Sequence, residues 1–298
     1  MKKHGITISL DDKALKFICY CLVGLFAFPC LFPFLVMISS SFMTEQEIVV
    51  EGYKLFPNTR SVSAYQYLLG NPKKIIDAYK ITIFNTAFGT FFALFFMSMA
   101  GYVLNRKDFK YRNVFSFFIY FTTLFSGGLI PSYILMVKYL HLKDSVFSMI
   151  LPGVMSAWSV FLMRNFMKSI PDSLYESATI DGAGDFYIYW RIFLPLAVPA
   201  LATIGLFSAL GYWNEWYNAM LYIQTPSKYP LQYFLQKMVN QVNIQTLIAQ
   251  GVVIDTSDLP TQSVKMAVAV LATGPIILLY PFVQRYFVSG LTVGAVKG

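Results

Sequence analysis

Six long stretches of this sequence carry no charged side chain, and they limit what the chain can fold into. A helix needs about 20 mostly apolar residues to cross a bilayer, with a range of about 17–25. The stretches contain 19 to 28 residues each. They predict membrane-spanning helices at about 17–42, 81–104, 113–137, 145–163, 196–217 and 265–284. Only 13% of the residues are charged, against about 25% in soluble domains. The expected fold class is therefore all-α, a polytopic membrane protein with six transmembrane helices in one membrane domain, 1–298.

The basic residues predict how these helices are oriented. Cytoplasmic segments of membrane proteins are enriched in Lys and Arg. Of the 23 basic residues, 13 fall in the two terminal tails and in the second-to-third and fourth-to-fifth loops. We therefore expect a multi-pass membrane protein with both termini in the cytoplasm and an uncleaved first span. The net charge of +8 then reflects topology and contact with anionic lipid, and no nucleic-acid partner is expected.

Most enzymatic chemistry has no sequence support here. No G-x-x-x-x-G-K-[ST] loop, H-E-x-x-H or C-x-x-C motif occurs, and the chain has two histidines in separate segments. The three cysteines lie in the first span and suit apolar packing. We expect no catalytic residue, no metal and no cofactor. The spans also lack the buried ionisable groups of a proton relay, so energy for transport must come from another subunit.

A polar, glycine-containing stretch interrupts this apolar chain between Arg164 and Arg191. Ser173 followed by Glu176 matches a capping box and predicts a short helix from Leu174 to Asp181. Gly182 is placed to end that helix in a left-handed conformation. Asp185 is expected to cap a second helix. Residues alone leave open whether this stretch is only a capped elbow at the membrane surface.

The pattern E-S-A, then Gly182, then I-F-L-P at 192–195, resembles the EAA loop of permease subunits in binding-protein-dependent ABC importers. Ser177 departs from the usual second alanine but is still small. The resemblance implies that 172–185 folds as a coupling helix that docks on a cytoplasmic ATPase. The residues implied to make that contact are Glu176, Ser177, Ala178, Asp181, Gly182 and Ala183.

Two further motifs are similar to the maltose-type carbohydrate branch of that family. W-N-E-W at 213–216 resembles a carbohydrate-permease signature, and G-L-T-V-G-A-V-K-G at 290–298 resembles a tail that reaches into the ATPase. The cytoplasmic tail 286–298 is thus expected to contact the ATPase through Gly294, Val296 and Lys297. Lys265-Met266 and Tyr280-Pro281 are nearest to the branch for complex oligosaccharides, including uronate-containing ones.

The resemblance implies the type I ABC importer permease fold, a place in the bacterial inner membrane and a set of partners. These are a second homologous permease in a heterodimer, an ATPase dimer that binds ATP, and an extracellular solute-binding protein. The long, amide-rich outer loop from about Leu221 to Gln262 is expected to face the binding protein, with 251–261 as the contact. Aromatic and amide side chains suit a sugar path, although such residues also serve as interfacial belts and helix packing. The candidate path residues are Asn85, Tyr120, Trp158, Trp213 and Asn214.

The predicted function is a permease subunit that forms half of an oligosaccharide translocation pathway and couples it to a separate ATPase. An ABC importer permease for a non-sugar solute and a stand-alone facilitator are the alternatives. An intramembrane glycosyl transferase is disfavoured because Glu176, Asp181 and Asp185 lie near a capped turn and the spans hold no acidic residue except Glu215 at an end.

Overall fold

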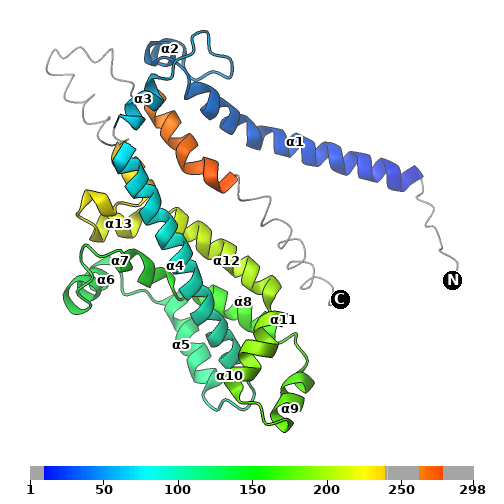
Figure 1. The fold of residues 1–298 in the computed structure, drawn as a ribbon. Helices are drawn as coiled ribbons and strands as arrows, with labels where there is room; N and C mark the ends of the chain where they lie inside the picture. Colours follow the sequence, from blue (N-terminus) through cyan, green and yellow to red (C-terminus); the bar gives the residue numbers. More distant parts are fainter. Residues whose placement is uncertain (1–9, 71, 239, 241–261, 278–298) are drawn as a thin grey trace. The chain divides into compact units, whose positions relative to one another are not determined.

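The computed structural model describes residues 10–70, 72–238, 240 and 262–277, and within these the regular structure is helical (Figure 1). The chain divides into two compact units, 1–70 with 242–271 and 71–241 with 272–298. The predicted tail residues Gly294, Val296 and Lys297 and the predicted loop contact 251–261 lie outside the described residues.

The first unit contains the amino-terminal helix and a small cap. Its helices are α1 (Leu10–Ser40), α2 (Glu45–Glu51), α3 (Ser63–Leu69) and the first part of the helix Gln262–Ile277. The Glu47 carboxylate accepts hydrogen bonds from the backbone N–H groups of Asn58 (2.7 Å) and Thr59 (3.0 Å). The Glu45 carboxylate accepts others from Gln262 and Ser263, at the positive end of their helix. These two acids hold the loop 52–62 and that helix start in place.

The second unit carries the core. Its elements are α4 (Pro72–Asn105), α5 (Arg112–Leu124), α6 (Leu129–Ile134), a π-helical turn (Leu135–Tyr139), α7 (Phe147–Ile150), α8 (Ala157–Met167), α9 (Asp172–Ile180), α10 (Asp185–Ile188), a second π-helical turn (Tyr189–Phe193), α11 (Leu194–Leu196), α12 (Val198–Trp213) and α13 (Tyr217–Tyr222). Short 3-10 turns cover Leu151–Gly153 and Pro226–Lys228.

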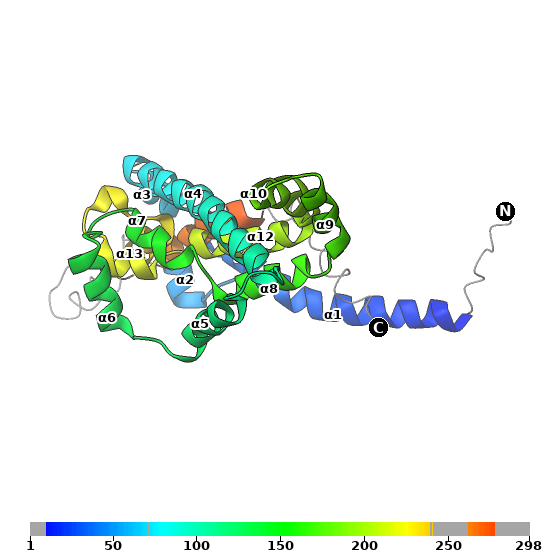
Figure 2. The same cartoon turned by 90° about the horizontal axis from the view of Figure 1, so that it is seen from below.

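Helix α4 is the axis of this core, with α8 and α12 packed along it (Figures 1 and 2). Their buried side chains include Ala93 and Met97 of α4, Met163 of α8 and Ile204 of α12. A glycine in α4 lets α12 approach closely. A Cβ at Gly89 would lie 2.6 Å from the Tyr212 ring, so only glycine allows α12 to seat its tyrosine against α4.

Two of the predicted spans are broken in the structure, and a third sharp bend lies at the start of the fifth predicted span. The helices of 113–137 meet at 115°, those of 145–163 at 49°, and the α10–α11 segment meets α12 at 81°. Proline explains the last break, because Pro195 and Pro199 lack an N–H donor and their rings clash with the preceding turn. Among the described residues, two helices are long and apolar enough to span a membrane, or up to five if each bent pair counts as one. The sixth predicted span, 265–284, is described only to Ile277.

Candidate functional site

The predicted coupling segment folds as the short helix α9 followed by a sharp elbow. Gly182 has φ +81° and ends the helix as predicted. Its N–H donates to the carbonyl oxygen of Thr179 (3.0 Å), and the N–H of Ala183 donates to that of Ala178 (2.9 Å). This is the paired pattern of a Schellman motif. The left-handed residue reverses the chain, so α10 starts only three residues later.

Two capping predictions were wrong. The helix begins at Asp172, with Pro171 in the cap position and no side-chain capping bond, so Ser173 and Glu176 form no capping box. Pro171 explains the shift, since its ring fixes φ near the helical value and its backbone sets the entry (φ −59°, ψ 132°). Asp185 is likewise the first residue of α10 rather than its cap. Its carboxylate instead accepts a hydrogen bond from the Tyr175 hydroxyl at 3.0 Å.

The predicted docking residues divide between two faces of α9. Glu176, Ser177, Asp181 and Gly182 are exposed. Ala178 and Ala183 instead pack, partly buried, against the core of their own chain. Their small side chains therefore let α9 lie close to the elbow, and it is the other face that is open to a partner. That face also presents Ile180, which is 86% exposed; the capping and small-residue signals did not single it out.

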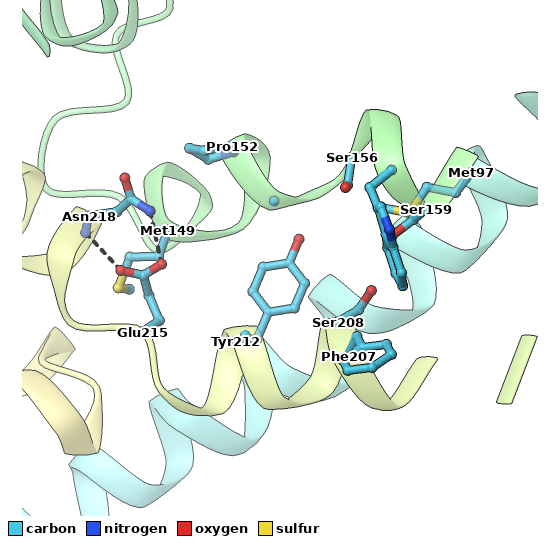
Figure 3. Close-up of a pocket in the computed structure, with 13 residues that line it drawn as sticks. Met97, Met149, Pro152, Ser156, Ser159, Phe207, Ser208, Tyr212, Glu215 and Asn218 are labelled. Atoms are coloured by element: carbon cyan, nitrogen blue, oxygen red, sulfur yellow. Dashed lines mark hydrogen bonds between the residues drawn. The ribbon is translucent and has the colours of Figure 1, made fainter. Parts of the chain in front are cut away.

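A cavity of about 450 Å³ lies between α4, α8 and α12, and Tyr212 rises into its middle (Figure 3). Its apolar wall includes Met97, Met149 and Phe207, and the Trp158 ring lies edge-on to Phe207, with ring centroids 5.5 Å apart. The polar lining residues are Ser156, Ser159, Ser208, Tyr212, Glu215 and Asn218. A mixed lining of this kind gives ring surfaces for apolar faces and oxygens for hydroxyl groups.

Glu215 is the one ionisable carboxyl in this lining. Its Oε1 accepts the backbone N–H of Asn218 (2.7 Å) and its Oε2 accepts the Asn218 side-chain amide (2.9 Å), as the dashed lines of Figure 3 show. These bonds fix the turn between α12 and α13. The carboxylate therefore holds the cavity's end in shape while its remaining lone pairs face the lining.

Of the five sequence-predicted path residues, Trp158 alone lines this cavity. Asn85 is fully buried and its amide lies 3.6 Å from the Met149 sulfur, while Trp213 is buried and donates to the carbonyl oxygen of Ala272. Tyr120 is exposed on α5. Asn214 accepts a hydrogen bond from Gln232. The structure thus brings Trp158 together with residues that were not predicted.

Helical spacing could have found the missed residues. Ser208 and Tyr212 stand at i and i+4, so they share one face of α12, and Glu215 follows three residues later in the turn after that helix. Ser156 and Ser159 are likewise three apart at the start of α8. The signal was weak because such polar residues sit among the apolar side chains of a span. Across the described residues, no group of three His, Cys, Asp or Glu side chains could hold a metal ion.

Three comparisons place this architecture among known proteins. Residues 97–293 match the family model described as binding-protein-dependent transport system inner membrane component. The chain is 38% identical to the polygalacturonan/rhamnogalacturonan transport system permease protein YtcP of Bacillus subtilis (strain 168), over 97% of this chain and 100% of that protein. It is 29% identical to the arabinooligosaccharides transport system permease protein AraQ of Halalkalibacterium halodurans, over 91% and 93% of the two chains.

A solved structure agrees with these sequence relatives. It is described as a bacterial ABC transporter involved in the import of the acidic polysaccharide alginate, and one of its chains matches with a TM-score of 0.80 and 34% identity. The match covers 94% of this chain and 98% of that one. The all-α permease fold and the family resemblance expected from the sequence are confirmed. The chain belongs to the binding-protein-dependent transport system inner membrane components, the permease subunits of ABC importers.

Proposed function

We propose that this chain is the permease subunit of an oligosaccharide importer, with pectic or other plant-derived glycans as its substrate class. The observation that carries the proposal is the 38% identity, over the full length of both chains, to a protein named for polygalacturonan and rhamnogalacturonan transport. A relative named for arabinooligosaccharides and a structural neighbour involved in alginate import support the wider class, oligosaccharides. The cavity's aromatic and hydroxyl lining suits a sugar ring.

The energy is supplied by a separate cytoplasmic ATPase that docks on α9. The exposed face of α9, with Glu176, Ser177 and Asp181 beside the apolar Ile180, supports this contact. A second permease completes the pathway, and a solute-binding protein delivers the sugar from outside. ATP binding closes the ATPase dimer and moves α9, which switches the pathway between inward- and outward-facing states. Reversing a 1:99 population to 99:1 needs about 5.5 kcal/mol of differential binding.

This assignment places α9 and both termini on the cytoplasmic side. The turn at Gln224 then lies outside. A cysteine at Ile180 and one at Gln224, both exposed in the structure, should react with a membrane-impermeant maleimide from opposite sides of sealed vesicles. Equal labelling of both from outside contradicts the orientation.

Deletion and co-purification test the function. A strain lacking this gene should lose uptake of pectic oligosaccharides and keep amino-acid uptake, and a tagged copy should retain an ATPase through purification. Isolated, the chain should not bind ATP. Loss of amino-acid uptake with intact glycan uptake refutes the substrate class. Uptake that persists without any ATPase identifies the chain as a facilitator instead.

A further inference from the structure

Helix α9 has little apolar attachment to the rest of the chain. All nine of its residues are described, and none of them is buried. A helix this short has marginal stability on its own. A pull applied to α9 therefore reaches the spans through its short connections to α8 and α10, through partial packing of Tyr175 and Ala178, and through a few specific side-chain contacts.

The main contact is an arginine stacked on a tyrosine. The Arg106 guanidinium carbon lies 3.0 Å from the centroid of the Tyr175 ring. Arg106 directly follows the last residue of α4, and Tyr175 lies in the middle of α9. The tyrosine hydroxyl continues the chain of contacts, because it donates to Asp185 Oδ1 on the far side of the elbow.

Arg106 is itself firmly held. Its side chain is 15% exposed, and one terminal nitrogen lies 2.9 Å from Asp108 Oδ1. That hydrogen bond lowers the pKa of the Asp108 carboxyl. The buried Nε has no hydrogen-bond partner within the described part of the chain. The ring face of Tyr175 thus adds to the Asp108 carboxylate in compensating a mostly desolvated cation, a setting that strengthens cation–π attraction.

A second link returns to α4 from the elbow. The Tyr102 hydroxyl lies 3.4 Å from the backbone oxygen of Asp185, and the Tyr102 ring packs edge-on against Phe193 with centroids 5.0 Å apart. Nearby, the hydroxyls of Ser98 and Tyr189 lie 2.7 Å apart in a buried contact. The elbow is therefore fixed to α4 by packing, and the Arg106–Tyr175 pair joins α9 to the end of α4.

The neighbouring ion pair does not compete with this contact. Lys107 Nζ lies 2.5 Å from Asp172 Oδ2, but the two side chains are 77% and 57% exposed. Solvent and salt screen a pair of this kind, and its contribution is small. Lys107 therefore offers a matched control, since it carries the same charge one residue further along the same loop.

We propose that Arg106, acting through Tyr175, is the positioning residue that makes α9 and α4 move as one body when the ATPase moves α9. The inference rests on the proposed function, because it takes α9 as the site where the ATPase acts. The coupling machinery then includes the connection between α4 and α5 as well as the coupling segment 172–185. The planar guanidinium is required rather than the positive charge, because stacking on a ring needs a flat group.

The test follows the distance between the two helices in the assembled importer. Spin labels are attached to cysteines at Val103 on α4 and Ile180 on α9, both exposed, after Cys19, Cys21 and Cys30 are replaced by serine. The complex purified with its ATPase is measured without nucleotide and after trapping with ATP and vanadate. In the wild type, the label distance should be the same in both states. In Arg106→Ala, trapping should produce a second distance, with about a tenfold shift in the ratio of the two populations.

Further variants separate stacking from charge and from general damage. Tyr175→Leu and Arg106→Lys should behave like Arg106→Ala. Tyr175→Phe, which keeps the ring, and Lys107→Ala should behave like the wild type. Tyr175→Leu and Arg106→Ala remove the same contact from its two sides. Either variant therefore tests the inference if the other purifies poorly.

Three results would overturn the proposal, and they are distinguishable. If the complex retains its ATPase and every variant keeps the single wild-type distance, the Arg106 inference fails and the proposed function stands. If the wild-type chain retains no ATPase, the proposed function fails and the inference fails with it. A second distance in Lys107→Ala as large as that in Arg106→Ala also contradicts the specific role of the stacked pair.

Discussion

The Tyr212 hydroxyl donates a hydrogen bond to the backbone oxygen of Ile150 at 2.9 Å, and this bond ties α12 to the end of α7. The tyrosine ring lies against Gly89 of α4 on the way, and its hydroxyl end lies against Gly153. One side chain therefore joins the three segments around the cavity. Its contacts add to the apolar packing that brings these helices together.

This contact predicts a measurable loss of stability. Tyr212→Phe leaves a buried carbonyl without its partner, which should cost about 1 kcal/mol. Gly89→Ala forces a methyl group into the ring and should cost about 1–3 kcal/mol. Thermal unfolding of the detergent-solubilised protein measures both. Gly211→Ala in α12, where an added Cβ meets nothing within 4 Å, is the control and should not lower the midpoint.

Gly182→Ala should weaken ATPase retention. A residue other than glycine at φ +81° costs about 1–2 kcal/mol of backbone strain, and the Schellman bonds of α9 loosen. The bulkier Gly182→Leu should be more severe than Glu176→Ala, which removes only an exposed carboxylate. Pull-down of the ATPase from solubilised membranes reports the effect, at unchanged membrane levels.

The control for that prediction is a second glycine in the same elbow. Gly184 has φ −75°, which any residue adopts, and an added Cβ there meets nothing within 4 Å. Gly184→Ala should therefore have the smaller effect. Equal retention by Gly182→Leu and the wild type would mean that the stretch is an elbow without a docking role.

Asp144 predicts a pH dependence outside the spans. Its carboxylate accepts hydrogen bonds from the N–H groups of Gln224 and Thr225, from the Thr225 hydroxyl and from Lys228. The bond from the Thr225 hydroxyl, followed by the others, lowers the pKa of Asp144 well below its usual value. The stability that this supplies is therefore full above the unfolded-state pKa of about 4 and is lost as the pH falls through the lower folded-state value.

The midpoint of thermal unfolding should thus stay constant between neutral pH and about pH 5, with an acid loss that begins only below about pH 4. Asp144→Asn should lower the midpoint at neutral pH, because about 1 kcal/mol of stability is lost, and it should reduce the acid-dependent loss. An Asp144→Asn protein with the same neutral midpoint and the same acid slope as the wild type contradicts this role.

Trp158 and Tyr120 give opposite predictions for transport. Trp158 lines the cavity beside Phe207, whereas Tyr120 lies exposed on α5. Trp158→Ala should raise the KM for uptake of a transported oligosaccharide by about tenfold, equivalent to about 1.4 kcal/mol of lost contact. Tyr120→Ala should leave it unchanged. The reverse pattern would place the sugar path on α5 instead.

Sequence alone determined the features that depend on local chemistry and on the solvent. Charge-free runs long enough for a bilayer indicated helices, because only internally bonded backbone is stable in lipid. The position of Gly182 indicated a left-handed turn, since glycine adopts that conformation without the strain that a Cβ brings. The spacing of the E-S-A stretch and of the terminal motifs indicated the family.

Tertiary structure decided everything that depends on which faces meet. The sequence could not show that Ala178 turns inward, that Tyr175 meets Arg106 some 69 positions earlier in the chain, or that Trp158 rather than Tyr120 reaches the cavity. In a membrane chain nearly every helical face is apolar, so hydrophobic periodicity loses its power to identify the buried side. Contacts between distant segments, such as Tyr212 with Gly89, then depend on packing shape, and shape emerges only when the helices are assembled.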